Sequence, residues 1–157
     1  MKKRAAHVFM NLVPSLWAGL ILGGGILSIL AIFDVPLAEK SFAYSAAARV
    51  FERVALIEWG FLGLILLGIL TLQFPPKRTF VTGMIAVIFI LQELWLHPVL
   101  SERASILASG GQVETSLAHP VFAVLSLVKL LLLIGLSFSE LYHFRFCRDR
   151  AVLAPSK

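Results

Sequence analysis

Several ionisable side chains stand inside long apolar stretches of the sequence, where they demand a chemical explanation. Lys129 is the only charged residue in the run 117–139, and Glu93 is the only one in the run 79–100. Glu93 and His97 are four residues apart, so they share one face of a helix. A charge at the centre of a bilayer costs about 2.5–3.5 kcal/mol on insertion scales, so it must find a partner or line a cavity.

Two histidines and two carboxylates form a candidate metal site, because Glu58, Glu93, His97 and His119 fall in the same half of the predicted structure. Imidazole and carboxylate groups bind divalent metals, and the two histidines could instead ligate a haem iron, one from each helix. The third possibility is a structural network that contains a buried ion pair between Lys129 and either Glu93 or Glu58. We predict Glu93 as the partner. The metal hypothesis requires His119 to face the interior beside His97.

The elements that carry these residues are predicted to be membrane-spanning helices. Each apolar run approaches the 20 or so residues with which a helix crosses a bilayer, and none alternates strictly as the strands of a barrel do. Hydrophobic residues make up 59% of the 157 residues and charged residues 15%, against about 25% charged in soluble proteins. We predict an all-α integral membrane protein with one domain, 1–157: an antiparallel bundle of four transmembrane helices, with spans at about 10–33, 55–74, 79–100 and 117–140.

Prolines and polar residues predict where these helices end. Pro75 and Pro76 end the second helix, since neither can donate the next backbone hydrogen bond. Pro98 is expected to end or kink the third helix for the same reason. Thr115 or Ser116 can cap the fourth helix at its N-terminus.

Residues 37–53 predict an amphipathic outer extension before the second helix. Apolar side chains at positions such as 43, 47 and 50 form a stripe, and Lys40 and Arg53 lie mostly off it. We expect this segment to lie at the outer interface, or to project from it, and then to run into the second span.

The charge distribution predicts the orientation. The net charge is +5, and these charges gather at the helix ends, where they contact anionic lipid rather than nucleic acid. Nine basic residues fall on one side against four on the other, which places both termini in the cytoplasm, here of a bacterial inner membrane. The nine are Lys2, Lys3, Arg4, Lys77, Arg78, Arg145, Arg148, Arg150 and Lys157. Three tryptophans near the span ends fit an interfacial aromatic belt: Trp17, Trp59 and Trp95.

Small residues recur at helical spacing in the first two spans. Ser15, Gly19 and Gly23 are four residues apart in the first, and Gly60 and Gly63 lie in the second. Small side chains let membrane helices approach closely. We expect them to pack helices within the bundle; the alternative is a seam on the first helix for a second copy or for another membrane protein.

Five stretches of the sequence stand out in this order: Trp17-Ala18-Gly19, the segment 46–51, Leu96-His97-Pro98, Leu117-Ala118-His119 and the apolar run 125–136. Together they resemble a widespread family of small four-helix membrane proteins of unknown function, which includes a human transmembrane protein associated with cisplatin resistance. The resemblance covers about residues 15–138. It implies the fold and topology and draws attention to His119, but it supplies no reaction. The chain departs from the family at 25–28, where a proline deep in the first helix is usual.

The sequence contains no recognised catalytic signature, such as a glycine-rich phosphate loop after a strand. We therefore predict that the protein is not an enzyme. The leading hypothesis is an accessory or scaffold subunit of a larger membrane complex. The alternative is a small transporter or a metal- or haem-handling protein that uses the histidine and glutamate cluster, to which the resemblance adds an association with metal resistance.

Overall fold

The computed structural model describes residues 12–35, 40–72 and 74–152, with side chains described up to residue 138. Within these ranges its regular secondary structure is entirely helical, and four helices are long and apolar enough to cross a membrane, which confirms the predicted number and type of elements. Their bounds are Leu12–Phe33, Lys40–Thr71, Pro76–Ala108 and Ala118–Phe138. The predicted start of the first span at residue 10 lies outside the described residues, as do Lys2, Lys3, Arg4 and Lys157.

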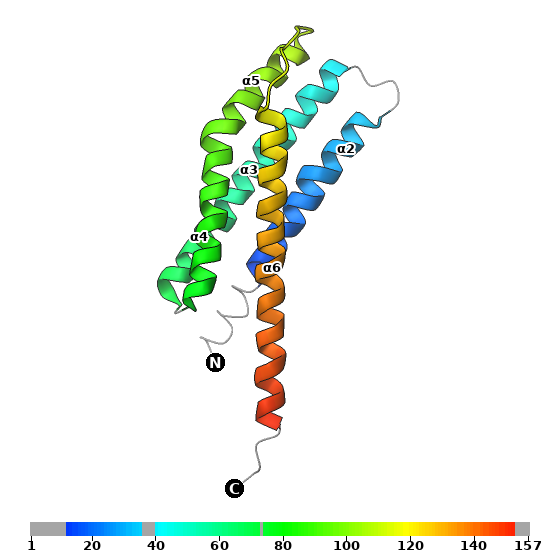
Figure 1. The fold of residues 1–157 in the computed structure, drawn as a ribbon. Coiled ribbons are helices and arrows are strands. Elements are labelled where there is room, and N and C mark those ends of the chain that lie inside the picture. The colour runs from blue at the N-terminus through cyan, green and yellow to red at the C-terminus, as the bar shows by residue number, and fades with distance from the viewer. Residues whose placement is uncertain (1–11, 36–39, 73, 153–157) are drawn as a thin grey trace.

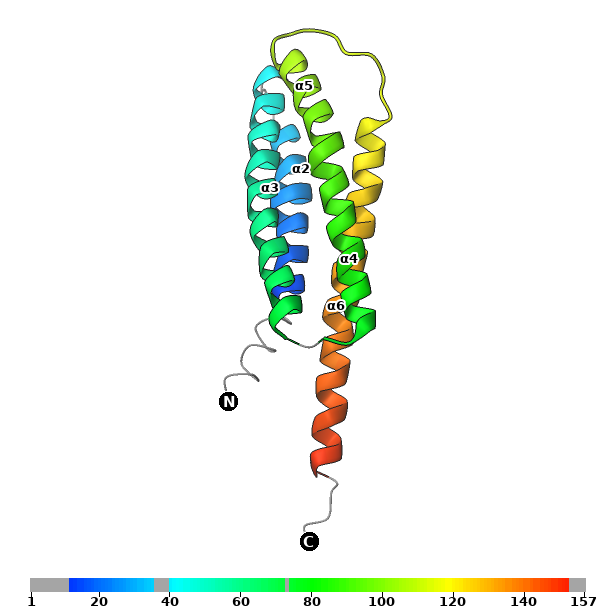
Figure 2. The same cartoon turned by 90° about the vertical axis from the view of Figure 1, so that its left-hand side faces the viewer.

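The helices run alternately up and down, so that the start of the first helix and the far end of the last lie at the same end of the bundle (Figures 1 and 2). The last helix, α6, continues well beyond the other three (Figure 1). The labelled elements after residue 20 are η1 (Ile21–Leu27), α2 (Ser28–Phe33), α3 (Lys40–Thr71), α4 (Pro76–Leu91), η2 (Gln92–Leu96), α5 (His97–Ala108) and α6 (Ala118–Val152).

The predicted amphipathic extension is the first part of α3 rather than a separate interfacial helix. The helix is continuous over 32 residues, and Ala43 and Ala47 are buried where α3 packs along α5. Alanine side chains allow two helices to approach closely, so this segment joins the bundle. The expectation that it runs into the second span is confirmed, and its position relative to the outer interface stays a prediction.

The third helix does not end at Pro98. It continues through the proline to Ala108, because the chain first makes a π-helical turn at η2, where the His97 N–H bonds to the carbonyl of Gln92, five residues back. Such a turn adds one residue to the helix and accommodates the missing proline donor. The predicted end at residue 100 was therefore too early.

A helix boundary lies at the two prolines, as predicted, but α3 already ends at Thr71, before the predicted residue 74, and the third helix begins before the predicted residue 79. Pro76 is the first residue of α4, in the position where a missing N–H costs nothing. At the start of α6, the Ala118 N–H donates to Ser116 Oγ at 3.1 Å. Gly110 in the preceding loop has a φ of 81°, which favours glycine.

The small residues do not pack the helices of this bundle together. A Cβ added at Gly19, Gly23, Gly60 or Gly63 would meet no atom within 4 Å, and Ser15 is exposed. These residues face outward, so the predicted packing role is wrong. The close approach is at Gly24, because a Cβ there would lie 3.1 Å from Val54 Cγ2 on α3. Spacing identifies a smooth face, but not the direction in which it points.

The apolar core occupies the half of the bundle near the start of the first helix. Trp17, Leu62, Phe89 and Leu133, one from each helix, are buried at its centre. In the opposite half, α2, α5 and the start of α6 contribute none of the buried core residues, and the start of α3 contributes only the small Ala43 and Ala47. This asymmetry leaves room for the cavity described below.

Candidate functional site

A buried ion pair joins the second and fourth helices. Lys129 Nζ lies 2.9 Å from Glu58 Oε1 and 3.1 Å from Oε2, and both side chains are almost inaccessible. The indole N–H of Trp17, on the first helix, donates to Glu58 Oε1 at 2.7 Å. Lys129 is therefore paired, as predicted, but its partner is Glu58 and not Glu93. The register of α3 brings Glu58 onto the inward face with Ala55, Leu62 and Ile65.

Aromatic rings enclose this pair. Lys129 Nζ lies 5.0 Å from the centroid of the Phe89 ring, a distance at which the ring face attracts a cation. Trp17 meets Phe89 edge-to-face at 5.8 Å and stacks on Phe61 at 6.1 Å. The prediction that Trp17 belongs to an interfacial belt is wrong, because its side chain is completely buried. No sequence signal separates it from Trp59 and Trp95, which are both exposed.

A second carboxylate lies close to the pair. Glu93 Oε2 is 3.7 Å from His97 Nδ1 across one helical turn, as their spacing predicted. Glu93 is also within electrostatic range of both Glu58 and Lys129. His97 in turn lines the cavity. Ionisable groups thus extend from the cavity to the middle of the bundle.

Gln92 is a buried polar residue that the sequence analysis missed. Its amide Nε2 donates to Ser126 Oγ at 2.8 Å and to the carbonyl of Phe122 at 3.3 Å, so it ties the third helix to α6. Its Oε1 accepts no hydrogen bond from the described part of the chain. A glutamine in the middle of an apolar run was the available signal, since such a side chain needs partners.

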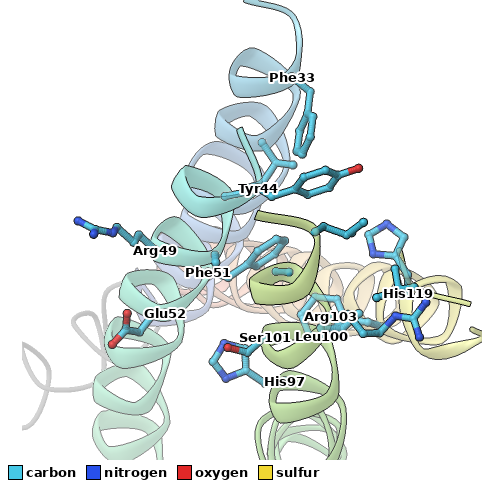
Figure 3. A pocket seen from close by; sticks show the side chains of 17 residues that line it. Phe33, Tyr44, Arg49, Phe51, Glu52, His97, Leu100, Ser101, Arg103 and His119 are labelled. Atoms are coloured by element: carbon cyan, nitrogen blue, oxygen red, sulfur yellow. The ribbon is translucent and has the colours of Figure 1, made fainter. Parts of the chain in front are cut away.

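The described structure contains a cavity of about 640 Å³ in the half of the bundle away from the core (Figure 3). Its volume is in the range of about 300–1,000 Å³ that is usual for small-molecule sites. All four helices contribute to its walls, which are mostly apolar. The lining residues are Ile29, Phe33, Tyr44, Ala47, Ala48, Arg49, Phe51, Glu52, His97, Leu100, Ser101, Arg103, Ala104, Leu107, Val113, His119 and Phe122.

Aromatic pairs hold the walls of the cavity. Phe51 on α3 meets Phe122 on α6 edge-to-face, with ring centroids 5.8 Å apart. Phe33 and Tyr44 make a similar contact at 5.4 Å between α2 and α3. Contacts of this geometry are favourable beyond the apolar area they bury. The cavity is therefore bounded by defined contacts between helices.

The predicted metal site is not assembled. His97 and His119 both line the cavity, but the His97 ring lies between α3 and α5, and the His119 ring lies on the other side of α5 (Figure 3). Glu58 is held by Lys129 and Trp17. No group of three or more histidine, cysteine, aspartate or glutamate side chains suited to a metal occurs in the part of the chain that the structure describes. The arrangement does not favour the haem alternative either, because the two rings lie on opposite sides of α5 (Figure 3).

The fold and the site together define a four-helix protein, compatible with an integral membrane protein, that has a buried ion pair and a cavity of ligand size. No family model, curated protein or solved structure matches the chain.

Proposed function

We propose that the protein is an integral membrane protein that binds a small, largely apolar organic molecule in the cavity, as the binding step of a small transporter or carrier. The single observation that carries this proposal is a cavity of about 640 Å³ walled by all four helices. Pockets of this size, mostly apolar with a few polar groups, are the usual form of small-molecule sites. In this proposal the protein binds the molecule without catalysing a reaction, and the binding does not depend on a metal.

Exposed apolar side chains support insertion into a bilayer. Leu70, Leu94 and Leu117 are 83%, 71% and 79% exposed, and soluble proteins rarely present large apolar surfaces of this kind. The distribution of basic residues supports an orientation with both termini in the cytoplasm of a bacterial inner membrane. Cys147 then lies inside the cell. A membrane-impermeant thiol reagent applied to intact cells should leave it unlabelled, and strong labelling would reverse the orientation.

Filling the cavity is the test of the proposed function. Ala104 lines the cavity from α5, so Ala104→Trp should occupy part of the space that a ligand needs. We expect native mass spectrometry of the protein, extracted in mild detergent, to show a bound small molecule on the wild type and to show at least about a tenfold lower occupancy on Ala104→Trp.

The matched control is Ala123→Trp, which adds the same ring on an exposed position of α6 outside the cavity. This variant should retain the bound molecule. Equal occupancy in the wild type and Ala104→Trp, with both folded, would contradict the proposal.

A second candidate function is that of an accessory subunit in a larger membrane complex. It is favoured by the outward direction of Ser15, Gly19 and Gly23 on the first helix, a face that small residues leave smooth enough for another helix. If this face binds a partner or a second copy, Gly19→Leu should release it on native extraction. Gly83→Leu, also in open space but on α4, should not. A solitary monomer in the wild type argues against this role.

We also propose that the chain belongs to the family that its sequence resembles. Two features favour it: Trp17 occupies the centre of the buried cluster, and His97 and His119 both line the cavity.

A further inference from the structure

The mouth of the cavity beside α6 carries basic side chains. Arg103 on α5 and His119 at the start of α6 both line the cavity, and in Figure 3 both lie on the α6 side of α5. Arg103 Nη2 donates to the backbone carbonyl of Glu114 in the loop before α6. This bond fixes the position of the guanidinium but uses one of its five N–H donors. The group can therefore also bind an acidic head group.

The acidic groups near the cavity do not neutralise this mouth. Among the described residues, Glu52 is the only lining residue with a carboxylate, and it is exposed and points away from the cavity in Figure 3. Arg49 points away as well. Glu114 contributes its backbone carbonyl and not a charge to the contact with Arg103. The side chains that face a ligand on the α6 side are therefore basic.

The remaining surface of the cavity suits a hydrocarbon chain. Phe51, Leu100 and Phe122 belong to its apolar wall, and the wall includes the edge-to-face contact between Phe51 and Phe122. An elongated apolar group buried there leaves water, which is favourable at about 25 cal/mol per Å². A basic mouth above an apolar interior complements a molecule with one acidic end and one alkyl chain.

We propose that the ligand of this cavity is a long-chain carboxylate, with its head group at Arg103 and His119 and its alkyl chain along Phe51 and Phe122. This inference rests on the proposed function, which requires only that the cavity binds some apolar molecule. The carboxylate accepts charge-assisted hydrogen bonds from Arg103, which are roughly twice as strong as neutral ones. A neutral molecule with the same chain lacks them.

The experiment uses the purified full chain in nonionic detergent and measures binding of radiolabelled hexadecanoate. Unlabelled hexadecanoate and hexadecan-1-ol compete for the site, since they share a chain and differ in the head group. We expect saturable binding, and competition by the alcohol about tenfold weaker than by the acid. Arg103→Gln should weaken hexadecanoate binding about tenfold, and Arg103→Lys, which retains the charge, should restore most of it.

Arg53→Gln is the matched control, because Arg53 is an exposed arginine of α3 that does not line the cavity; it should bind as the wild type does. The thermal unfolding midpoint of each variant establishes that it is folded. If Arg103→Gln does not fold, the acid-to-alcohol ratio of the wild type decides the question. Equal competition by acid and alcohol overturns the carboxylate assignment.

The failure of this inference can be distinguished from that of the proposed function. If hexadecanoate does not bind saturably, but Ala104→Trp still loses the co-purified molecule that the wild type retains, only the ligand class is wrong. If Ala104→Trp and the wild type retain the same molecule equally, both proposals are overturned.

Discussion

Replacing Lys129 with methionine is expected to lower the free energy of unfolding by about 3–5 kcal/mol, the usual result of removing one partner of a buried ion pair. Glu58 would remain buried, with the Trp17 indole N–H as a hydrogen-bond donor but without the cation of Lys129. Methionine fills a similar volume, so the loss comes from charge and hydrogen bonding rather than from a void. Reversible unfolding in mixed detergent micelles measures the change.

The double variant Glu58→Leu, Lys129→Met distinguishes this cause from a general sensitivity of the site. Replacing both partners with apolar residues is often neutral or stabilising, so the double variant should be closer to the wild type than Lys129→Met is. Lys40→Met, at an exposed position of α3, should change the stability by less than about 0.5 kcal/mol. A Lys129→Met variant as stable as Lys40→Met would show that the pair does not hold the bundle together.

Replacing Trp17 with alanine should be comparably damaging. Removing a fully buried tryptophan costs about 3–5 kcal/mol, because its contacts are lost and a void remains. Here the void would open between Phe61 and Phe89, on which the indole packs. Trp17→Phe keeps much of the ring but loses the N–H that donates to Glu58, so its effect should be smaller, about 1–3 kcal/mol. Unfolding in the same micelles provides both values.

Trp95→Ala is the control for this series, since Trp95 is 63% exposed on the third helix. It should cost far less than Trp17→Ala. If the two alanine variants are equally destabilised, Trp17 is not the buried centre of the four helices, and the hydrogen bond to Glu58 carries no special weight.

These two predictions concern the half of the bundle that is packed, and the cavity lies in the other half. Trp17, Glu58, Phe89 and Lys129 come from four different helices and contact one another. They fix the helices at one level, so the far ends can enclose a space without coming apart. Variants of the packed half should therefore act mainly on stability, and variants of the lining should act mainly on binding.

The helices themselves could be predicted from the sequence because length and hydrophobicity decide them. The apolar runs, Pro76 and the cap at Ser116 each act through local chemistry. At Pro98 the sequence left two outcomes open, an end or a kink, and the π-helical turn Gln92–Leu96 that lets the helix continue could not be predicted, because the local pattern does not specify it. A proline in a helix removes a donor, but whether the chain stops or widens its turn depends on the packing around it.

For the candidate site, the sequence predicts the types of residue involved but not how they are arranged. An ion in an apolar run had to be paired, and Lys129 is. The rotation of each helix about its axis decides whether Lys129 pairs with Glu58 or with Glu93, and whether Trp17 points inward. An apolar sequence does not specify that rotation, because lipid-facing and buried positions are equally hydrophobic. For the same reason, Gly19 and Gly60 were predicted to pack between helices although they face outward, and His97 and His119 were predicted to share one metal site.

The most direct test of a ligand cavity between these helices is an experimental structure of the protein in a lipid bilayer. The proposed function predicts non-protein density between α3, α5 and the start of α6, and the carboxylate inference places the polar end of that density at Arg103 and His119. The proposed function would be contradicted if the helices pack closely together there, so that Phe51, Phe122 and their neighbours fill this space and no non-protein density lies between them.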